Sequence, residues 1–206
     1  MQSIGVILVS KLFAFSKFSL AVGTFWTSFS LRAMLTPLVG AFGGALGISL
    51  LASSTLAQML FFKKALSLSF LAFSGIPSIA ASLYWAFESR VARIIIPAFC
   101  MVLFIAHPEG MYAAPYALYW LIPIGVAYFS YESIFLLALG STFTAHAVGS
   151  VLWLYATHMQ AGYWYGLLPL VPAERLLLAS GMAVSYYAFS YCYSLADHFF
   201  VHRVRA

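Results

Sequence analysis

The sequence predicts an all-α protein embedded in a membrane, a polytopic bundle of about six transmembrane helices preceded by an N-terminal interfacial or partly inserted helix. Of its 206 residues, 64% are hydrophobic and only 7% are charged, which is too few to cover a soluble domain of this size. The hydrophobic residues form long runs without the alternation that membrane β-strands require. We therefore expect residues 1–206 to form one integral membrane domain.

The N-terminal segment, residues 1–30, differs from the rest of the chain. Its apolar run, residues 4–26, is interrupted by Lys11 and Lys17, whose charges are costly in hydrocarbon unless their side chains reach the interface. An amphipathic helix that lies in the interface or is partly inserted is therefore expected. A full span is the alternative, and it would place the N-terminus on the other side of the membrane. The six-helix bundle is assigned to residues 31–206.

The run over residues 33–62 is rich in small residues at helical spacing. Small side chains let helix backbones approach closely, which drives helix association inside lipid. We therefore expect this helix to be the most closely packed one. Its packing partner is either another helix of the chain or another subunit. The expected packing interface consists of Gly40, Ala41, Gly44, Ala45 and Gly47.

Three shorter or interrupted runs follow. Residues 65–87 carry Gly75 and Pro77 near their middle, which predicts a kinked or interrupted helix. Residues 91–106 make a short run that is barely long enough to span the membrane. Residues 111–130 form the third run.

Prolines and aromatic residues distinguish the run over residues 111–130. Pro115 and Pro123 are expected to break its helix. Aromatic side chains gather toward one end, and an interfacial belt is favoured over a ligand site. The aromatic residues concerned are Tyr112, Tyr116, Tyr119 and Trp120.

The run over residues 132–157 carries its polar groups on one side. It spans about 39 Å as a helix, more than a bilayer core needs. At about 100° per residue, Thr142, His146, Ser150 and Trp153 fall in one sector. An imidazole in mid-span is costly in lipid, so His146 should face the bundle interior and is a candidate functional residue. The alternative is a neutral histidine whose nitrogens are hydrogen-bonded by its neighbours.

An aromatic connection, residues 158–172, leads to a last span over residues 173–198. Pro169 and Pro172 break the connection, which should cap the bundle at the interface. Arg175 either extends toward the headgroups or holds an anionic group of a ligand. Together with Trp164 it would close a site above the polar sector, suited to a planar heteroaromatic molecule with a polar tail. The candidate ligand-binding residues are Thr142, His146, Ser150, Trp153, Trp164 and Arg175.

Basic residues set the expected orientation. With the C-terminal Arg203 and Arg205 in the cytoplasm, more Lys and Arg residues fall inside than outside. The chain is then a multi-pass protein of the inner (cytoplasmic) membrane. The turn at residues 107–115 and the connection at residues 158–172 would lie on the outer face.

Several activities lack a signal in the sequence. There is no HExxH motif, no Gly-rich phosphate loop and no pair of carboxylates at helical spacing, so no catalytic set, metal site or cofactor is predicted. Cys100 and Cys192 lie inside apolar runs and suggest neither a disulfide framework nor a metal site. The net charge of +5 is concentrated at the ends of apolar runs, so nucleic acid is not an expected partner.

Taken together, the Gly/Ala-rich helix Pro37–Ser53, the AHAVGS stretch and the loop LPLVPAERLLLASG give the chain an architecture that resembles the S components of energy-coupling-factor vitamin transporters. The resemblance implies a protein that captures a micronutrient from outside. It also implies that the small-residue face docks a transmembrane scaffold subunit driven by two ATPases. Nickel and cobalt members of that family begin with Met-His, whereas Gln2 follows Met1 here, so a metal substrate is disfavoured.

Two other classes of function fit the sequence. A membrane-embedded enzyme could use His146 or Glu132 as a base, although no acidic residue lies at the depth of His146. A structural or assembly protein could use the same polar residues only to hold helices together. The lipid bilayer, a small-molecule ligand and a scaffold with its ATPases are the partners we expect.

Overall fold

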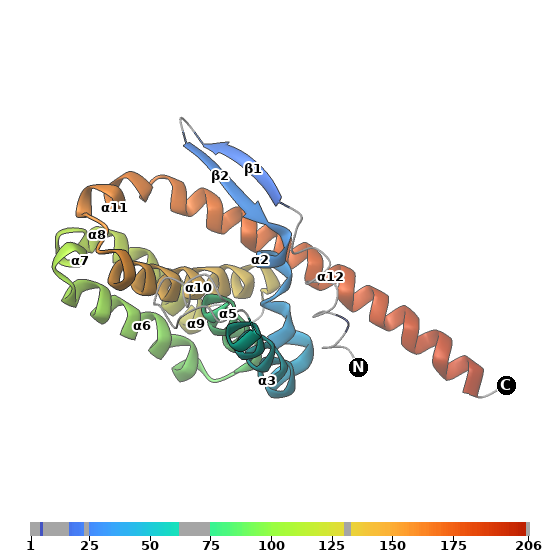
Figure 1. The fold of residues 1–206 in the computed structure, drawn as a ribbon. Helices are drawn as coiled ribbons and strands as arrows, with labels where there is room; N and C mark the ends of the chain where they lie inside the picture. The colour runs from blue at the N-terminus through green and yellow to red at the C-terminus, as the bar shows by residue number, and fades with distance from the viewer. Residues whose placement is uncertain (1–4, 6–16, 23–24, 62–74, 130–132, 205–206) are drawn as a thin grey trace.

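The described part of the chain is helical apart from one hairpin (Figure 1). The structure, a computed structural model, describes residue 5 and residues 17–22, 25–61, 75–129 and 133–204. The predicted helical class therefore holds for the bundle. Within the run predicted over residues 65–87, residues 65–74 lie outside the described residues.

The end of the N-terminal segment is a hairpin rather than the predicted interfacial helix. Strand β1 (Lys17–Val22) pairs antiparallel with β2 (Phe25–Ser30), with Lys17 opposite Ser30 and Val22 opposite Phe25. Gly23-Thr24 separates two stretches rich in β-branched and aromatic residues, a pattern typical of a hairpin. The helix predicted for residues 4–26 is therefore wrong over its last part, while residues 6–16 lie outside the described residues.

The small-residue run begins as α2 (Leu31–Leu35) and continues, after Pro37, as α3 (Leu38–Phe61). Gly44 interrupts α3 with φ 51° and ψ −141°, a backbone conformation that glycine adopts with far less strain than other residues. In the most apolar window of α3, 33% of the residues are buried, against 50% in α10 (Ile134–Thr157). The expectation that residues 33–62 form the most closely packed helix is therefore wrong.

Within the chain, the small residues of α3 do not act as one packing face. A Cβ on Gly40 would overlap the backbone carbonyl of Ser82, so α3 and α5 (Ile76–Ala86) touch there. Nothing lies within 4 Å of a Cβ on Gly44. Ala41 is half-buried, Ala45 is exposed, and a Cβ on Gly47 would meet the carbonyl oxygen of Val39 in the same helix. At Gly44 and Ala45 the prediction of internal packing is therefore corrected.

Helices α5 and α6 follow the predicted interruptions. Gly75 has φ 107°, and α5 begins at the next residue with Pro77 in its first turn, where proline is tolerated. Helix α6 (Arg90–Ala106) has 17 residues and contains Pro97. In the run over residues 65–87, a helix thus begins at the predicted break, while residues 65–74 lie outside the described residues. The run over residues 91–106 is short, as predicted.

The run over residues 111–130 is segmented. Helix α7 (Pro108–Tyr112) precedes α8 (Ala114–Ala117), the 3₁₀ turn η2 (Leu118–Trp120) and α9 (Leu121–Phe129). Pro115 and Pro123 each lie in the first turn of a helix, where the missing N–H has no intrahelical partner to lose. The prolines thus mark helix starts rather than sharp kinks.

Helix α10 is the centre of the bundle. It begins after Ser133, whose side chain accepts a hydrogen bond from the N–H of Leu136 at 3.3 Å, and ends at His158, which has φ 50°. Helices α5, α6, α9 and α12 (Leu170–Val204) all contact it. The polar sector predicted on this helix therefore faces other helices.

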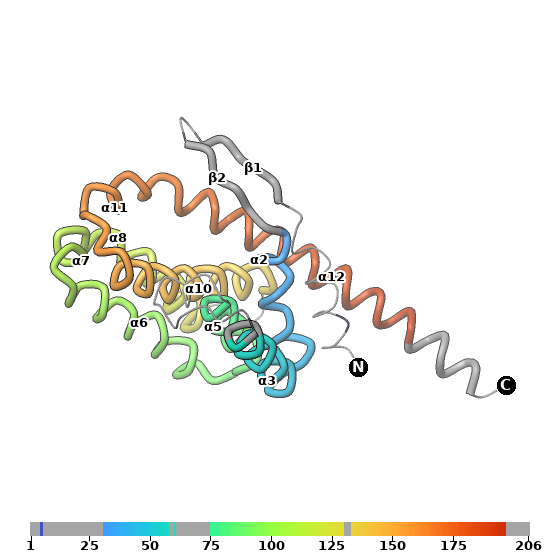
Figure 2. The backbone as a smooth tube through the Cα atoms, in the orientation of Figure 1, coloured from blue at the N-terminus to red at the C-terminus, as the bar shows by residue number. Residues whose placement is uncertain are grey.

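Helices α11 (Ala161–Leu167) and α12 arch over one end of the bundle, and α12 then runs past it toward the C-terminus (Figure 2). The start of α12 at Leu170 is three residues earlier than predicted. Helices α7, α8 and α11 lie together at one end (Figure 1).

Two helices of the described chain are long and apolar enough to cross a membrane. They are Leu38–Ala57 within α3 and Ile134–Thr157, which is α10. Ala161–Leu167 and Leu170–Ala196, bent by 51° against each other, give a third if they form one broken span. Ala114–Phe129 is a shorter apolar helix. The described part of the chain is thus helical with two or three candidate spans, and the six expected spans are not confirmed.

Candidate functional site

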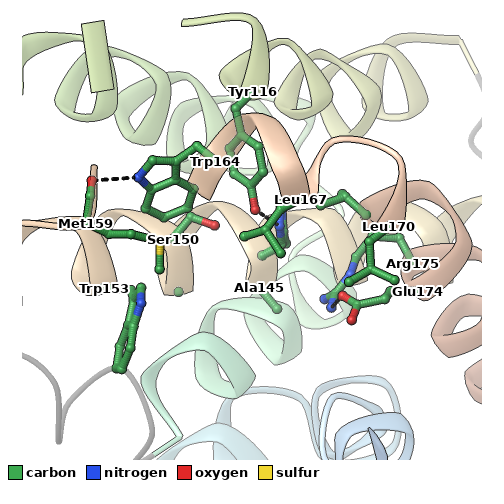
Figure 3. A pocket seen from close by; sticks show the side chains of 13 residues that line it. Tyr116, Ala145, Ser150, Trp153, Met159, Trp164, Leu167, Leu170, Glu174 and Arg175 are labelled. Carbon is green, nitrogen blue, oxygen red and sulfur yellow. Dashed lines mark hydrogen bonds and ion pairs between the residues drawn. The ribbon is translucent and has the colours of Figure 1, made fainter. Parts of the chain in front are cut away.

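A cavity of about 450 Å³ lies where α10 faces α8, α11 and the start of α12 (Figure 3). Its walls are mostly apolar and aromatic, and a few polar groups converge on it. This combination is typical of sites for small organic ligands. The lining residues are Tyr116, Ala145, His146, Gly149, Ser150, Trp153, Met159, Trp164, Leu167, Leu170, Val171, Glu174 and Arg175.

Five of the six candidate residues meet at this cavity. His146, Ser150 and Trp153 line it from α10, Trp164 from α11 and Arg175 from α12. Thr142 does not line it, and its hydroxyl donates to the carbonyl oxygen of Leu139 within the helix at 2.9 Å. The carbonyl oxygen of Thr142 instead accepts a hydrogen bond of 3.4 Å from Nη1 of Arg175.

The hydrogen bonds of His146 fix its tautomer. The indole N–H of Trp120, which can only donate, lies 3.2 Å from Nδ1 of His146. Nδ1 must therefore be an acceptor, and the ring proton is on Nε2, which lies 2.8 Å from the hydroxyl of Tyr116. His146 is thus a neutral imidazole with both nitrogens engaged by the protein, the second of the two readings that the sequence left open.

This tautomer determines what Tyr116 offers to the cavity. Because Nε2–H of His146 donates to its oxygen, the proton of the Tyr116 hydroxyl is left for another acceptor. Ser150, one turn beyond His146 on α10, interacts with the same hydroxyl. One of these two hydroxyls donates to the other, so the pair keeps one hydroxyl proton for a further acceptor.

An ion pair forms the other polar end of the cavity. Nη2 of Arg175 lies 3.1 Å from a carboxylate oxygen of Glu174, and both side chains are largely buried. Nε of Arg175 is also buried and has no hydrogen-bond partner among the described residues. A buried N–H without a partner costs roughly 1–3 kcal/mol, so this atom is a candidate contact for a bound molecule.

Aromatic rings shape the cavity wall. The Trp164 ring lies edge-on to Tyr116, with 4.9 Å between ring centroids, and edge-on to Phe104 at 5.1 Å. Its indole N–H donates to the carbonyl oxygen of Met159 at 3.1 Å (Figure 3). Trp164 is 2% exposed, so this wall is held in place before any ligand binds.

The two connections expected on the outer face are tied to each other. The N–H of Glu109 donates to Nδ1 of His107 at 3.2 Å, so the ring proton of His107 is on Nε2. Nε2 of His107 donates to Nδ1 of His158, with 3.2 Å between the two nitrogens. The hydroxyl of Tyr165 donates to the carbonyl oxygen of Tyr112 at 2.9 Å. These bonds hold α11, and with it Trp164, against α7.

The sequence interpretation missed Tyr116 and Trp120 as parts of the site. Both were assigned to an interfacial aromatic belt, but Tyr116 is 3% exposed and Trp120 is fully buried, so the belt is wrong for these two. Tyr112, by contrast, is 68% exposed. The signal was the spacing of four residues between Tyr116 and Trp120, which places two polar-tipped rings on one helix face.

The described residues give little support for metal binding or for acid–base catalysis. No group of three His, Cys, Asp or Glu side chains there could hold a metal ion. Glu132, one of the two candidate bases, lies outside the described residues. Cys100 is a buried free thiol and Cys192 an exposed one.

No protein-family model, no curated protein and no solved structure matches this chain.

Proposed function

We propose that this protein is a membrane-embedded capture subunit of an uptake transporter for a vitamin-like micronutrient. The observation that carries the proposal is the single cavity in which His146, Ser150, Trp153, Trp164 and Arg175 meet. Its volume of about 450 Å³ lies in the range of small-molecule sites. Rigid aromatic walls and a few directed polar groups suit a planar heteroaromatic molecule with a polar tail.

The proposal includes a topology of six spans with a cytoplasmic C-terminus in the inner membrane. Beyond the two or three candidate spans, α5, α6 and Ala114–Phe129 would cross as short or broken helices. Short helices can cross where the bilayer thins or where interrupted backbone is buried in protein. The cavity would then open toward the outer face, beside the joined connections at His107 and His158.

A transmembrane scaffold driven by two ATPases completes the proposal, as the resemblance to energy-coupling-factor S components suggests. Support comes from α3, where Ala45, Ser49 and Ser53 form an exposed small-residue stripe at intervals of four. Such a stripe allows close approach by a helix of another subunit. Ala45 is exposed, with no packing partner for it among the residues that the structure describes, which favours the alternative of another subunit.

Catalysis by His146 is less well supported by the geometry. A general base needs a nitrogen lone pair within reach of the substrate, and the only lone pair of neutral His146 accepts from Trp120. In the described structure, this histidine instead orients the hydroxyl of Tyr116. Capture without chemistry is therefore the function we favour.

Native mass spectrometry of the full chain purified in mild detergent tests the proposal. We expect a small metabolite to co-purify with the parent protein and to be lost in Trp153→Leu, which removes an aromatic wall of the cavity. The matched control is Phe99→Leu, at a residue of α6 that is 59% exposed and outside the cavity. A stoichiometric protein partner without any metabolite would contradict capture and favour an assembly role.

A further inference from the structure

The charges that line the cavity cancel. Among its lining residues only Glu174 and Arg175 are charged, because the hydrogen bond from Trp120 keeps His146 neutral. The guanidinium and carboxylate lie 3.1 Å apart, with side chains 15% and 16% exposed, so the two charges compensate each other locally. The cavity therefore has no net charge to offer a ligand.

A charged ligand would add a net charge to a cavity whose ion pair is largely buried. An uncompensated charge in such surroundings costs several kcal/mol in lost hydration, and the pair can attract it only by giving up part of its own contact. A carboxylate would compete with Glu174 for Arg175, and a cation would compete with Arg175 for Glu174. An uncharged ligand has neither cost.

The unused hydrogen-bonding capacity of the site consists of donors. Nε–H of Arg175 is buried without a partner in the described chain, and one hydroxyl proton of the Tyr116–Ser150 pair is left over. These donors come from α12, α8 and α10. A ligand that satisfies them must present acceptors, such as a ring carbonyl oxygen or a ring nitrogen.

We infer that the captured molecule is an uncharged, planar heteroaromatic compound whose acceptor atoms face Arg175 and the Tyr116–Ser150 pair. The inference rests on the proposed function and narrows its substrate class. It also argues against the alternative in which Arg175 holds an anionic group of the ligand. Arg175 acts here as a hydrogen-bond donor whose charge is already neutralised by Glu174.

The test compares pairs of probes that have the same shape and differ in charge. The probes are nicotinamide with nicotinate, and indole-3-acetamide with indole-3-acetate. Binding of each probe to the purified full chain in detergent at neutral pH is measured by isothermal titration calorimetry. We expect each amide to bind at least about tenfold more tightly than its carboxylate, which corresponds to about 1.4 kcal/mol.

Glu174→Gln provides the matched variant, because it leaves the charge of Arg175 uncompensated at nearly unchanged shape. We expect its preference to reverse toward the carboxylates. The double variant Glu174→Gln with Arg175→Gln is neutral again and should lose the preference for carboxylates. Circular dichroism and thermal unfolding show whether each variant is folded. If a variant does not fold, the comparison of amide and carboxylate binding to the parent protein decides the inference.

Two outcomes would overturn the inference in distinguishable ways. If a carboxylate binds the parent as tightly as its amide or more tightly, the neutral-ligand inference fails while capture stands. If neither member of either pair binds the parent or Glu174→Gln, both the capture function and the inference fail.

Discussion

The carboxylate of Glu109 accepts a hydrogen bond of 2.8 Å from the backbone N–H of Ala161, the first residue of α11. The two residues are 52 positions apart in the sequence. The Glu109 side chain on α7 therefore links α7 to α11, where it accepts from a backbone N–H that has no partner within its own helix. Helix α11 also carries Trp164. The negative charge of the carboxylate is also stabilised by the positive, N-terminal end of the α11 dipole. The cavity wall therefore depends on a contact between the connection at residues 107–115 and the connection at residues 158–172.

Glu109→Ala should destabilise the fold by roughly 1–3 kcal/mol, because it removes a charge-assisted hydrogen bond and leaves the N–H of Ala161 unpaired. Trp164 should become more accessible to a fluorescence quencher. Thermal unfolding in detergent and acrylamide quenching measure the two effects. Glu88→Ala, at an exposed glutamate before α6, is the control and should change neither. Equal behaviour of the two variants would show that Glu109 does not hold α11.

Gly44 and Gly40 should respond to substitution for different reasons. At Gly44 the cost comes from φ 51°, so Gly44→Ala and Gly44→Leu should both destabilise by about 1–3 kcal/mol and by similar amounts. At Gly40, the added methyl group of Gly40→Ala alone would push α3 away from Ser82, at a cost of about 1–3 kcal/mol.

Chemical unfolding of the three glycine variants in detergent gives these free energies. Gly162→Ala is the control, since nothing lies within 4 Å of a Cβ there. A much larger effect of Gly44→Leu than of Gly44→Ala would restore the packing role that the sequence first suggested for Gly44.

The parts of the fold that sequence predicted well are those set by local rules. The limits of α10 follow from a Ser cap and an apolar run of the right length, and α5 begins where Gly75 and Pro77 require a break. The polar sector of α10 could be placed because helical periodicity alone puts His146, Ser150 and Trp153 on one face.

The parts that sequence missed depend on partners far away in the chain. The neighbours of His146 are 30 and 26 residues distant, and no local pattern distinguishes a buried Tyr116 from an interfacial one. The same holds for Thr142, whose place beside the cavity rather than in it depends on how Arg175 reaches across from α12. Small residues on α3 predicted close packing but not which of them meets Ser82.

His146→Leu should destabilise the protein as well as alter the site. It leaves the N–H of Trp120 without its acceptor and Tyr116 without its donor, at a cost of about 2–4 kcal/mol for two buried groups. The sequence alone had suggested that this variant would fold normally. Thermal unfolding compares it with Ala145→Leu, a neighbouring change that replaces one apolar side chain by another and removes no hydrogen-bonding group. If His146→Leu is as stable as the parent, the hydrogen-bonded chain from Trp120 to Tyr116 does not contribute to the fold.

The proposed topology predicts which residues share a face of the membrane. Tyr112 and Gly162 belong to the two connections that the structure joins, whereas Glu88 precedes α6 at its opposite end. In a background where the exposed Cys192 and the buried Cys100 are replaced by alanine, Tyr112→Cys and Gly162→Cys should react with a membrane-impermeant maleimide added to cells. Glu88→Cys should react only after the membrane is opened, because α6 separates it from Tyr112. Reaction of Glu88→Cys in intact cells together with the other two would mean that α6 does not cross the membrane, and the six-span topology would then be wrong.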